Sequence, residues 1–291
     1  MKAIVRTHYG TPDVLQFTEV AKPTPADDEV LIKVYAAAVN PLDLFQMRGA
    51  PLLRSIPGMR TPKHQVLGVD IAGRVEAVGR NVKQFQPGDD VFGVTGFAGG
   101  GFAEYVCAAE DKLALKPANS SFEDAASVPV AALTALQGLR DKGRIQLGQK
   151  VLIDGASGGV GTFAVQIAKS FGAEVTAVCS TRKMDTARRI GADHVIDYTR
   201  EDFTRSGQRY DLILGANVHH SIFDYMRAES GRNLCHRRGR PGANFPSDFT
   251  RSFTVADWEQ EDVLLYREYK PEGFGFSERS SGIWKSCTHH R

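Results

Sequence analysis

The sequence has no long apolar run, little cysteine and no excess of charge of either sign. No stretch reaches the roughly 18 apolar residues that a transmembrane helix needs. The four cysteines are far apart and form no C-x-x-C pair, which argues against a disulfide framework and a cysteine-rich zinc lobe. The 36 Lys and Arg nearly balance the 34 Asp and Glu, so no broad field would attract nucleic acid or an acidic membrane. We therefore expect neither a nucleic acid nor a membrane as a partner.

The chain has 291 residues, which favours two domains of ordinary size, each able to bury a core. Its N-terminus, MKAIVRTHYG, lacks a basic stretch followed by an apolar segment, so we predict no secretory signal peptide. Together with the isolated cysteines, this favours a cytoplasmic location.

Residues 1–121 and 122–230 differ in pattern, and we expect a domain boundary between them. The first region has short strand-like stretches separated by turn residues, which is typical of a β-rich domain. Ser121 precedes Asp124 by three residues, a spacing that can open a helix. From Val151 onward strand-like and helix-like segments alternate, which predicts the parallel sheet of a doubly wound α/β domain.

Residues 231–291 form a third region without a clear pattern. They contain 6 Ile, Leu and Val, against 50 in residues 1–230, and show no helical or strand period. Phenylalanine is too frequent here for a plain disordered tail. We assign this region no fold and expect the parallel sheet of residues 122–230 to be incomplete.

The strongest chemical signal is a glycine-rich segment after the predicted strand Val151–Ile153. Apolar residues at helical spacing follow it over 160–171, which gives the order strand, turn, helix. A side chain in such a turn would hold the backbone away from a pyrophosphate, and the helix N-terminus offers N–H groups to an anion. The alternative is a glycine-rich turn without a ligand. The residues that we assign to a dinucleotide cofactor here are Ser157, Gly158, Gly159, Val160 and Gly161.

The end of the next predicted strand bears on the choice between NADH and NADPH. An enzyme that uses NADH usually places a carboxylate there, on the ribose 2′-hydroxyl. This sequence has Ser180, Thr181, Arg182 and Lys183 instead, two hydroxyls and two cations that could bind a 2′-phosphate. We therefore predict NADPH as the cofactor. The alternative is that Arg182 and Lys183 begin a solvated helix.

Several further stretches carry a family pattern. They are AAAVNPLDLFQMRG (36–49), VLGVDIAGRVEAVG (66–79), QPGDDVFG (86–93), GFAEYVCAAEDKLALKP (101–117), SVPVAALTAL (127–136) and GASGGVG (155–161). Together they resemble the zinc-free quinone oxidoreductase branch of the medium-chain dehydrogenase/reductase superfamily, over about residues 1–230. The resemblance implies a GroES-like β-rich domain followed by a Rossmann domain.

The resemblance also bears on metal binding. Zinc-dependent relatives have a cysteine in the first stretch and Gly-His-Glu in the second, where this chain has Asn40 and Gly68-Val69-Asp70. Because catalytic zinc needs three protein ligands of the N, S or O type, we predict no metal site. An NAD(P)-dependent alcohol dehydrogenase is therefore the weaker alternative.

Similarity to this branch implies that NADPH delivers hydride to a small electron-poor molecule, a quinone or an α,β-unsaturated ketone or aldehyde. By family position Asn40 would lie at the nicotinamide and the substrate, as the catalytic residue. Asn40 also precedes Pro41, so a simple turn residue is the alternative, with Asp43 capping the following helix. Further cofactor contacts fall on Thr134, on Ser180, Lys183 and Tyr198 around the 2′-phosphate, and on Asn217.

Two classes of function therefore stay open. The leading prediction is an NADPH-dependent reductase of quinones or activated alkenes. The alternative is an inactive or non-catalytic NADPH-binding relative, because relatives continue with further strands where this chain has residues 231–291. Relatives are often dimers, so we expect a homodimer by analogy.

Overall fold

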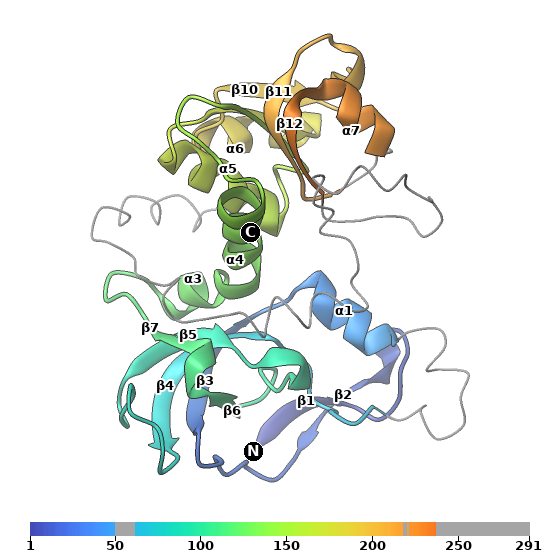
Figure 1. Ribbon diagram of the computed structural model, residues 1–291. Helices are drawn as coiled ribbons and strands as arrows, with labels where there is room; N and C mark the ends of the chain where they lie inside the picture. Colours follow the sequence, from blue (N-terminus) through green and yellow to red (C-terminus); the bar gives the residue numbers. More distant parts are fainter. Residues whose placement is uncertain (50–61, 218–219, 221, 237–291) are drawn as a thin grey trace, which may run out of the picture. The chain divides into compact units, whose positions relative to one another are not determined.

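The structure is a computed structural model that describes residues 1–49, 62–217, 220 and 222–236 (Figure 1). The chain divides into two units, the first reaching Val130 and the second beginning at Ala131. The division falls inside helix α4 (Pro129–Leu136), later than the position 121 at which we expected it. Each unit contains one five-stranded sheet.

The first unit is built on an antiparallel sheet in the order β6-β3-β4-β5-β7. A separate two-stranded sheet pairs β1 with β2. This is the β-rich domain that the short strands and turns predict, and it is confirmed. The strands are β1 (Lys2–Arg6), β2 (Leu15–Glu19), β3 (Glu29–Ala38), β4 (Asp70–Val78), β5 (Asp90–Val94), β6 (Tyr105–Ala109) and β7 (Leu113–Leu115).

Alternate residues of β3 and β4 fill the core of this unit. Val30 and Ile32 of β3 and Ile71 and Val75 of β4 are at most 2% exposed and belong to one cluster. Fully burying a side chain of this size contributes about 1.5–3 kcal/mol. Because a slip of one residue would turn these side chains to the other face, their burial specifies the register of the sheet.

The α-helices that lie wholly within the described part of the first unit are α1 (Pro41–Arg48) and α3 (Phe122–Ala126). The Ser121 hydroxyl accepts a hydrogen bond from the Asp124 N–H at 3.0 Å, at the start of α3. The predicted cap at Ser121 is therefore confirmed.

The second unit is built on a parallel sheet in the order β10-β9-β8-β11-β12. Since β8 comes first in the chain and lies at the centre, this is the order three-two-one-four-five of a Rossmann sheet. The predicted alternation of strands and helices is confirmed. The elements are β8 (Lys150–Asp154), α5 (Gly159–Ser170), β9 (Glu174–Cys179), α6 (Met184–Arg189), β10 (His194–Asp197), β11 (Tyr210–Gly215), α7 (Ile222–Ala228) and β12 (Glu229–His236).

Both faces of the parallel sheet are buried. Val151 and Ile153 of β8 pack on one face with Ala164 of α5. Leu152, between them, packs on the other face with Tyr225 of α7. All five residues are 0% exposed. Burial on both faces explains why β8 is a continuous aliphatic run and does not alternate between apolar and polar residues.

Strand β12 corrects the prediction for the end of the sheet. We expected no fold after residue 230, yet β12 continues to His236 and pairs in parallel with β11, for example Ile213 with Leu234. Its sequence, ESGRNLCH, contains one aliphatic residue, so hydropathy did not identify it. Pairing with β11 uses backbone hydrogen bonds, which do not require aliphatic side chains. The sheet is thus more complete than predicted, while residues 237–291 lie outside the described residues.

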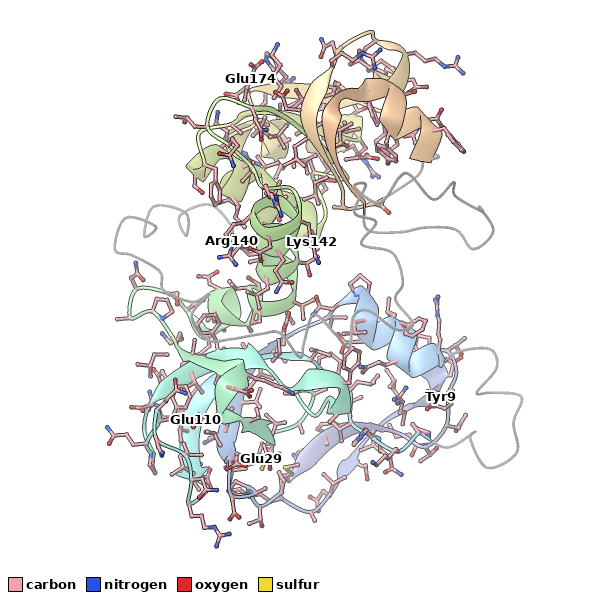
Figure 2. The ribbon with its side chains drawn as sticks, viewed as in Figure 1. Tyr9, Glu29, Glu110, Arg140, Lys142 and Glu174 are labelled. Atoms are coloured by element: carbon pink, nitrogen blue, oxygen red, sulfur yellow. The ribbon has the colours of Figure 1, made fainter. Side chains whose placement is uncertain are left out.

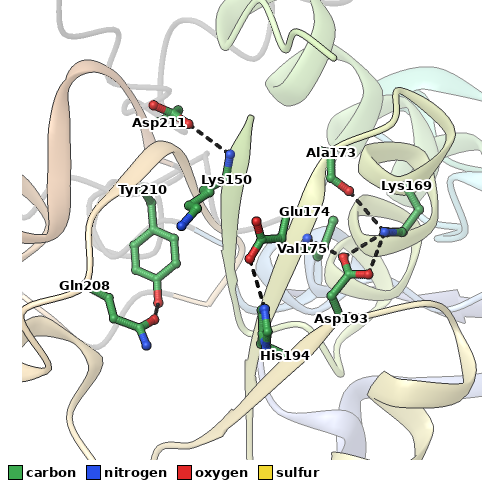
Figure 3. Close-up of polar contacts among 10 residues, drawn as sticks. All are labelled: Lys150, Lys169, Ala173, Glu174, Val175, Asp193, His194, Gln208, Tyr210 and Asp211. Atoms are coloured by element: carbon green, nitrogen blue, oxygen red, sulfur yellow. Dashed lines mark hydrogen bonds and ion pairs between the residues drawn. The ribbon is translucent and has the colours of Figure 1, made fainter. Parts of the chain in front are cut away.

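Polar contacts join the C-terminal end of α5 to the strands beside it (Figure 3). Lys169 Nζ donates to both carboxylate oxygens of Asp193 at 2.8 and 2.7 Å, and to the Ala173 carbonyl oxygen at 3.1 Å. Asp193 also accepts the Val175 N–H of β9 at 2.7 Å. These contacts lie at the N-terminal ends of β9 and β10 and fix the last turn of α5 there.

A π-helical segment, Gln137–Lys142, follows α4 directly, and the side chains of Arg140 and Lys142 project from it (Figure 2). The wider π-helical ring is closed by the Gly143 N–H, which donates to the Gly138 carbonyl oxygen at 2.8 Å. Of the described helices α5 is the longest, with 12 residues. No helix in the described part of the chain is therefore long and apolar enough to cross a bilayer.

Candidate functional site

Three glycines with different local roles build the turn between β8 and α5. Gly155 has a φ of +78°, and a Cβ there would lie 2.7 Å from the Asn217 Cβ. Gly158 is exposed, and a Cβ there would come within 3.5 Å of the Gly155 carbonyl oxygen. Gly161 is buried, and its Cβ would lie 2.1 Å from the same oxygen. The first glycine permits the tight turn, the second leaves room for a ligand, and the third lets the helix pack on the strand end.

Helix α5 begins directly after this turn, with Gly158 as its N-cap residue. The Val160 side chain is 8% exposed and belongs to the core, so Val160 can offer a ligand only its backbone. Ser157 is half-buried and Gly159 is exposed. The first N–H groups of the helix and the positive end of its dipole favour an anion such as a pyrophosphate. The five residues that we assigned to this turn lie together in it.

Two further predicted cofactor contacts lie near the turn. The Asn217 N–H, after β11, approaches the Asp154 carbonyl oxygen at 3.4 Å. Thr134 lies on α4, three residues after Ala131. A Cβ placed on Gly159 of the turn would lie 3.7 Å from the Ala131 Cβ. Residues three apart share a helix face, so Thr134 lies on the face of α4 that includes Ala131.

Tyr225 of α7 supports the residue that precedes the turn. Its hydroxyl donates to Asp154 Oδ2 at 2.5 Å, and the two side chains are 0% and 5% exposed. Desolvation by burial, together with the neighbouring Asp154 carboxylate, raises the pKa of Tyr225 above its ordinary value. The hydroxyl therefore stays protonated and remains a donor. A helix distant in the sequence thus fixes the end of β8.

The predicted phosphate-binding residues lie at the carboxyl ends of β9 and β10. Ser180 is half-buried directly after β9, and Arg182 and Lys183 are exposed. Because β10 pairs with β9, Tyr198 comes beside Ser180, and its N–H donates to the Cys179 carbonyl oxygen at 3.2 Å. The structure thus brings these residues to one edge of the sheet.

A carboxylate that the sequence analysis missed lies at this edge. Asp197, the last residue of β10, is 3% exposed and accepts hydrogen bonds from the Thr181 hydroxyl and from the Thr199 hydroxyl and N–H. The Thr181 hydroxyl is the main cause of a lowered pKa of Asp197. We found no acid among residues 179–183, but strand pairing places Asp197 opposite Cys179. Thr181 directs its hydroxyl proton to Asp197.

Asn40 of the first unit is the N-cap residue of α1. Its backbone N–H donates to Asp43 Oδ2 at 2.7 Å, and Asp43 Oδ1 accepts the Gly68 N–H at 3.1 Å. The capping role predicted for Asp43 is confirmed. Asp43 is 2% exposed, and desolvation raises the pKa of its carboxyl.

Asp70 is a second site residue that the sequence analysis missed. Its Oδ2 accepts a hydrogen bond from Asn40 Nδ2 at 3.0 Å, and its two oxygens lie 3.1 and 3.3 Å from the Val130 nitrogen, whose N–H donates to them. Asp70 is 0% exposed, and desolvation raises the pKa of its carboxyl to about 7. We considered this position only as an absent zinc ligand. The available signal was a single carboxylate within the apolar run VLGVDIAG, since a buried carboxylate needs donors.

The described residues contain no group of three or more His, Cys, Asp or Glu side chains that could hold a metal ion. The oxygens of Asp70 already accept N–H groups of the protein. Cys107 and Cys179 are free thiols.

Comparison with protein families matches both units. The model of the alcohol dehydrogenase GroES-like domain matches residues 26–118. The model of the zinc-binding dehydrogenase matches residues 159–226.

Individual proteins are similar over most of the chain. The chloroplastic quinone-oxidoreductase homolog of Spinacia oleracea is 38% identical over 245 residues, which cover 80% of this chain and 73% of that protein. The chloroplastic NADPH-dependent alkenal/one oxidoreductase of Arabidopsis thaliana is 38% identical over 228 residues, covering 74% of this chain but only 57% of that protein. The solved structure of the quinone oxidoreductase from Coxiella burnetii has a TM-score of 0.74 at 28% identity, covering 94% of this chain and 88% of that one. The chain belongs to the quinone oxidoreductase branch of the medium-chain dehydrogenase/reductase superfamily.

Proposed function

We propose that the chain binds NADPH and reduces quinones or α,β-unsaturated carbonyl compounds by hydride transfer, without zinc. The observation that carries the proposal is the glycine turn, where the exposed Gly158 leaves space at the N-terminus of α5. The names of the spinach and Arabidopsis relatives support quinones, alkenals and enones as acceptors.

Within this proposal the second unit holds the two anionic parts of the cofactor. The glycine turn accepts the pyrophosphate, with Thr134 and Asn217 as neighbouring contacts. The 2′-phosphate lies among Ser180, Lys183 and Tyr198, with Arg182 beside it. Asp197 does not exclude a phosphate, because its charge is already directed to the donors of Thr181 and Thr199. NADPH supplies the hydride when it is bound, so the chain's own residues have to position the reactants.

Ligand binding is the first test. NADPH or NADH is added to the purified chain while its thermal unfolding is followed, since a ligand at a hundredfold its Kd stabilises the native state by about 2.7 kcal/mol. We expect a shift with NADPH and a smaller one with NADH. Oxidation of NADPH in the presence of a quinone or an enone then tests turnover. Binding without turnover of either acceptor would favour the non-catalytic relative.

Two variants locate the cofactor. Gly158→Asp adds a carboxylate where the pyrophosphate is proposed, and we expect it to abolish the NADPH shift. Ser170→Asp adds the same charge at the other end of α5 and should leave the shift intact. Lys183→Ala removes a charge-assisted hydrogen bond and should weaken NADPH binding about ten- to a hundredfold. Lys150→Ala, at the opposite end of the parallel strands, is its matched control, and equal effects of the two lysine variants would contradict the assignment.

The homodimer and the cytoplasmic location expected from the sequence belong to the same proposal. Analytical ultracentrifugation of the purified chain tests the first. Cell fractionation tests the second, which is worth doing because the spinach and Arabidopsis relatives are named as chloroplastic. Turnover that survives dialysis against a chelator tests the absence of a zinc requirement.

A further inference from the structure

A four-residue motif occurs twice in the second unit, starting at the last residue of β10. The first copy is DYTR at 197–200, and the second is DFTR at 202–205. In each copy Oδ1 of the aspartate accepts the N–H and the hydroxyl of the threonine, at 3.0 and 2.7 Å in the first copy and at 2.9 and 2.7 Å in the second. The arginine N–H donates to the aspartate carbonyl oxygen, at 3.0 and 3.1 Å respectively. The two copies thus form the same turn, in which an aspartate binds its own backbone two residues on.

The surroundings of the two copies differ. Phe203 in the second copy is 1% exposed and belongs to a core cluster, whereas Tyr198 at the equivalent position is 54% exposed. Asp202 is exposed, and Asp197 is only 3% exposed. Among the described residues, Asp197 alone of the two aspartates accepts a hydrogen bond from outside its own turn, from the Thr181 hydroxyl to Oδ2. The first copy therefore has a contact that the turn itself does not need.

That contact joins the two segments on which the proposed 2′-phosphate ligands lie. The β9 segment, residues 180–183, follows β9 and contains Thr181, and the β10 segment, residues 198–200, follows β10 and contains Thr199. The two threonines bind opposite oxygens of Asp197, and their hydroxyl oxygens are 3.3 Å apart. One carboxylate thus fixes both segments.

We propose that Asp197 is a positioning residue for the 2′-phosphate of NADPH, because it holds the β9 segment and the β10 segment in one arrangement. This inference rests on the proposed function. The charge of Asp197 alone would act in the opposite direction, since a carboxylate repels a phosphate. The two threonine hydroxyls and Arg200, whose Nε lies 3.6 Å from Oδ2, offset that charge. Loss of Asp197 should therefore weaken binding of the phosphate, whereas an effect of charge alone would strengthen it.

Two nucleotides that differ in the 2′-phosphate separate positioning from charge. Adenosine 2′,5′-bisphosphate carries it and adenosine 5′-monophosphate lacks it, and calorimetric titration of the whole chain measures the affinity for each. Asp197→Ala should weaken the bisphosphate about tenfold and leave the monophosphate unchanged. Asp202→Ala removes the same turn contacts from the second copy and should leave both affinities unchanged. Tighter binding of the bisphosphate by Asp197→Ala, or an equal loss with both nucleotides, would overturn the proposal.

A double-mutant cycle tests whether Asp197 acts through Thr181. Thr181→Val keeps the shape of the side chain but removes the hydroxyl, so it breaks the contact between the segments and leaves the turn at Thr199 in place. We expect a severalfold weaker affinity for the bisphosphate in the wild-type background and no further loss in the Asp197→Ala background. If the two losses multiply in the double variant, the residues act independently and the proposal fails.

A spectroscopic measurement tests the contact without a ligand. In a ¹⁵N-labelled chain, Thr181→Val should move the amide signals of Tyr198 and Thr199 in the first copy of the motif and leave those of Phe203 and Thr204 in the second copy in place. Unmoved signals at Tyr198 and Thr199 would overturn the proposal even if NADPH binds. Moved signals in a chain that binds neither NADPH nor the bisphosphate would support the contact between the segments and reject the proposed function.

Discussion

Two buried acids of the first unit and two exposed acids of the second differ in what holds them. Asp43 and Asp70 are at most 2% exposed, and among the described residues their hydrogen bonds come from amide groups. Asp193 and Asp202 are exposed and are held by Lys169 and Thr204. Desolvation raises the pKa of both buried acids. It acts on Asp193 as well, but there the bonds from Lys169 and Val175 outweigh it, and the pKa is lowered.

The difference shows that one residue type serves two purposes. A buried acid with N–H donors orients the groups around it, at a cost in stability that grows as the pH rises. A surface acid with a cation or a hydroxyl gains its contact when it ionises, but solvent screens the gain. The candidate site of the first unit uses the first kind of acid, and the outer contacts of the Rossmann unit use the second.

Asp43→Ala should have the largest effect on stability. It removes the acceptor of the Asn40 and Gly68 N–H groups, and two unsatisfied donors at roughly 2 kcal/mol each give a loss of about 4 kcal/mol. Urea unfolding followed by circular dichroism measures it. Asp193→Ala is the control and should cost far less. Equal losses of stability in the two variants would contradict the distinction between buried and exposed acids.

The ionisation of Asp70 should have the next largest effect on the free energy of unfolding. Its pKa is about 7 in the folded chain, against roughly 3.9 for an unfolded carboxyl, so the folded state retains a proton that the unfolded state has released. Stability from this group is therefore full at low pH and is lost as the pH rises, by about 2 kcal/mol between pH 5 and 7. The asparagine of Asp70→Asn does not ionise. Between pH 5 and 7 the free energy of unfolding of the variant should therefore rise relative to that of the wild type by the same amount. A difference between the two that is constant with pH would show that Asp70 is not titrating in this range.

Asp193→Asn should have a small effect on stability. The contribution of Asp193 should change with pH in the direction opposite to that of Asp70. The Asp193 side chain is 36% exposed, so we expect a loss of roughly 0.2–1 kcal/mol, smaller at high salt. Because the pKa of Asp193 is lowered, its contribution is present above the ordinary carboxyl pKa and is lost as the pH falls through the folded value. Unfolding at low and high salt measures the loss. A loss that salt does not change would indicate that packing, not charge, dominates this contact.

Thr181→Val should have the smallest effect and is best measured at Asp197 itself. The variant removes the hydroxyl that is the main cause of the lowered pKa of Asp197, so that pKa should rise. Titration of the carboxyl carbon by NMR measures the change. Ser206→Ala, on a hydroxyl that donates to a backbone oxygen elsewhere in the unit, should leave it unchanged. An unchanged Asp197 pKa in Thr181→Val would show that Thr199 and the backbone suffice to hold this carboxylate.

The glycine turn could be predicted from the sequence because its chemistry is local. The order of strand, glycines and helix lies within one short segment, and each glycine has its role within that segment or against Asn217. The acids at Asp70 and Asp197 could not be predicted in the same way. Their donors come from Val130 and Thr181, which only the pairing of strands and the packing of helices bring close. Strand β12 was missed for a related reason, since a strand that pairs through its backbone does not need a hydrophobic pattern in its sequence.

The strand order of the parallel sheet also constrains how the chain is made. Strand β8 is synthesised first, yet its Leu152 pairs on one side with Thr176 and on the other with Ile213. A ribosome adds roughly 5–20 residues per second, so the central strand waits for several seconds with one edge uncovered while residues up to β11 emerge. An uncovered edge of an aliphatic strand pairs readily with other chains. The nascent chain is thus exposed to aggregation through this edge after the glycine turn has formed and before β11 has left the ribosome.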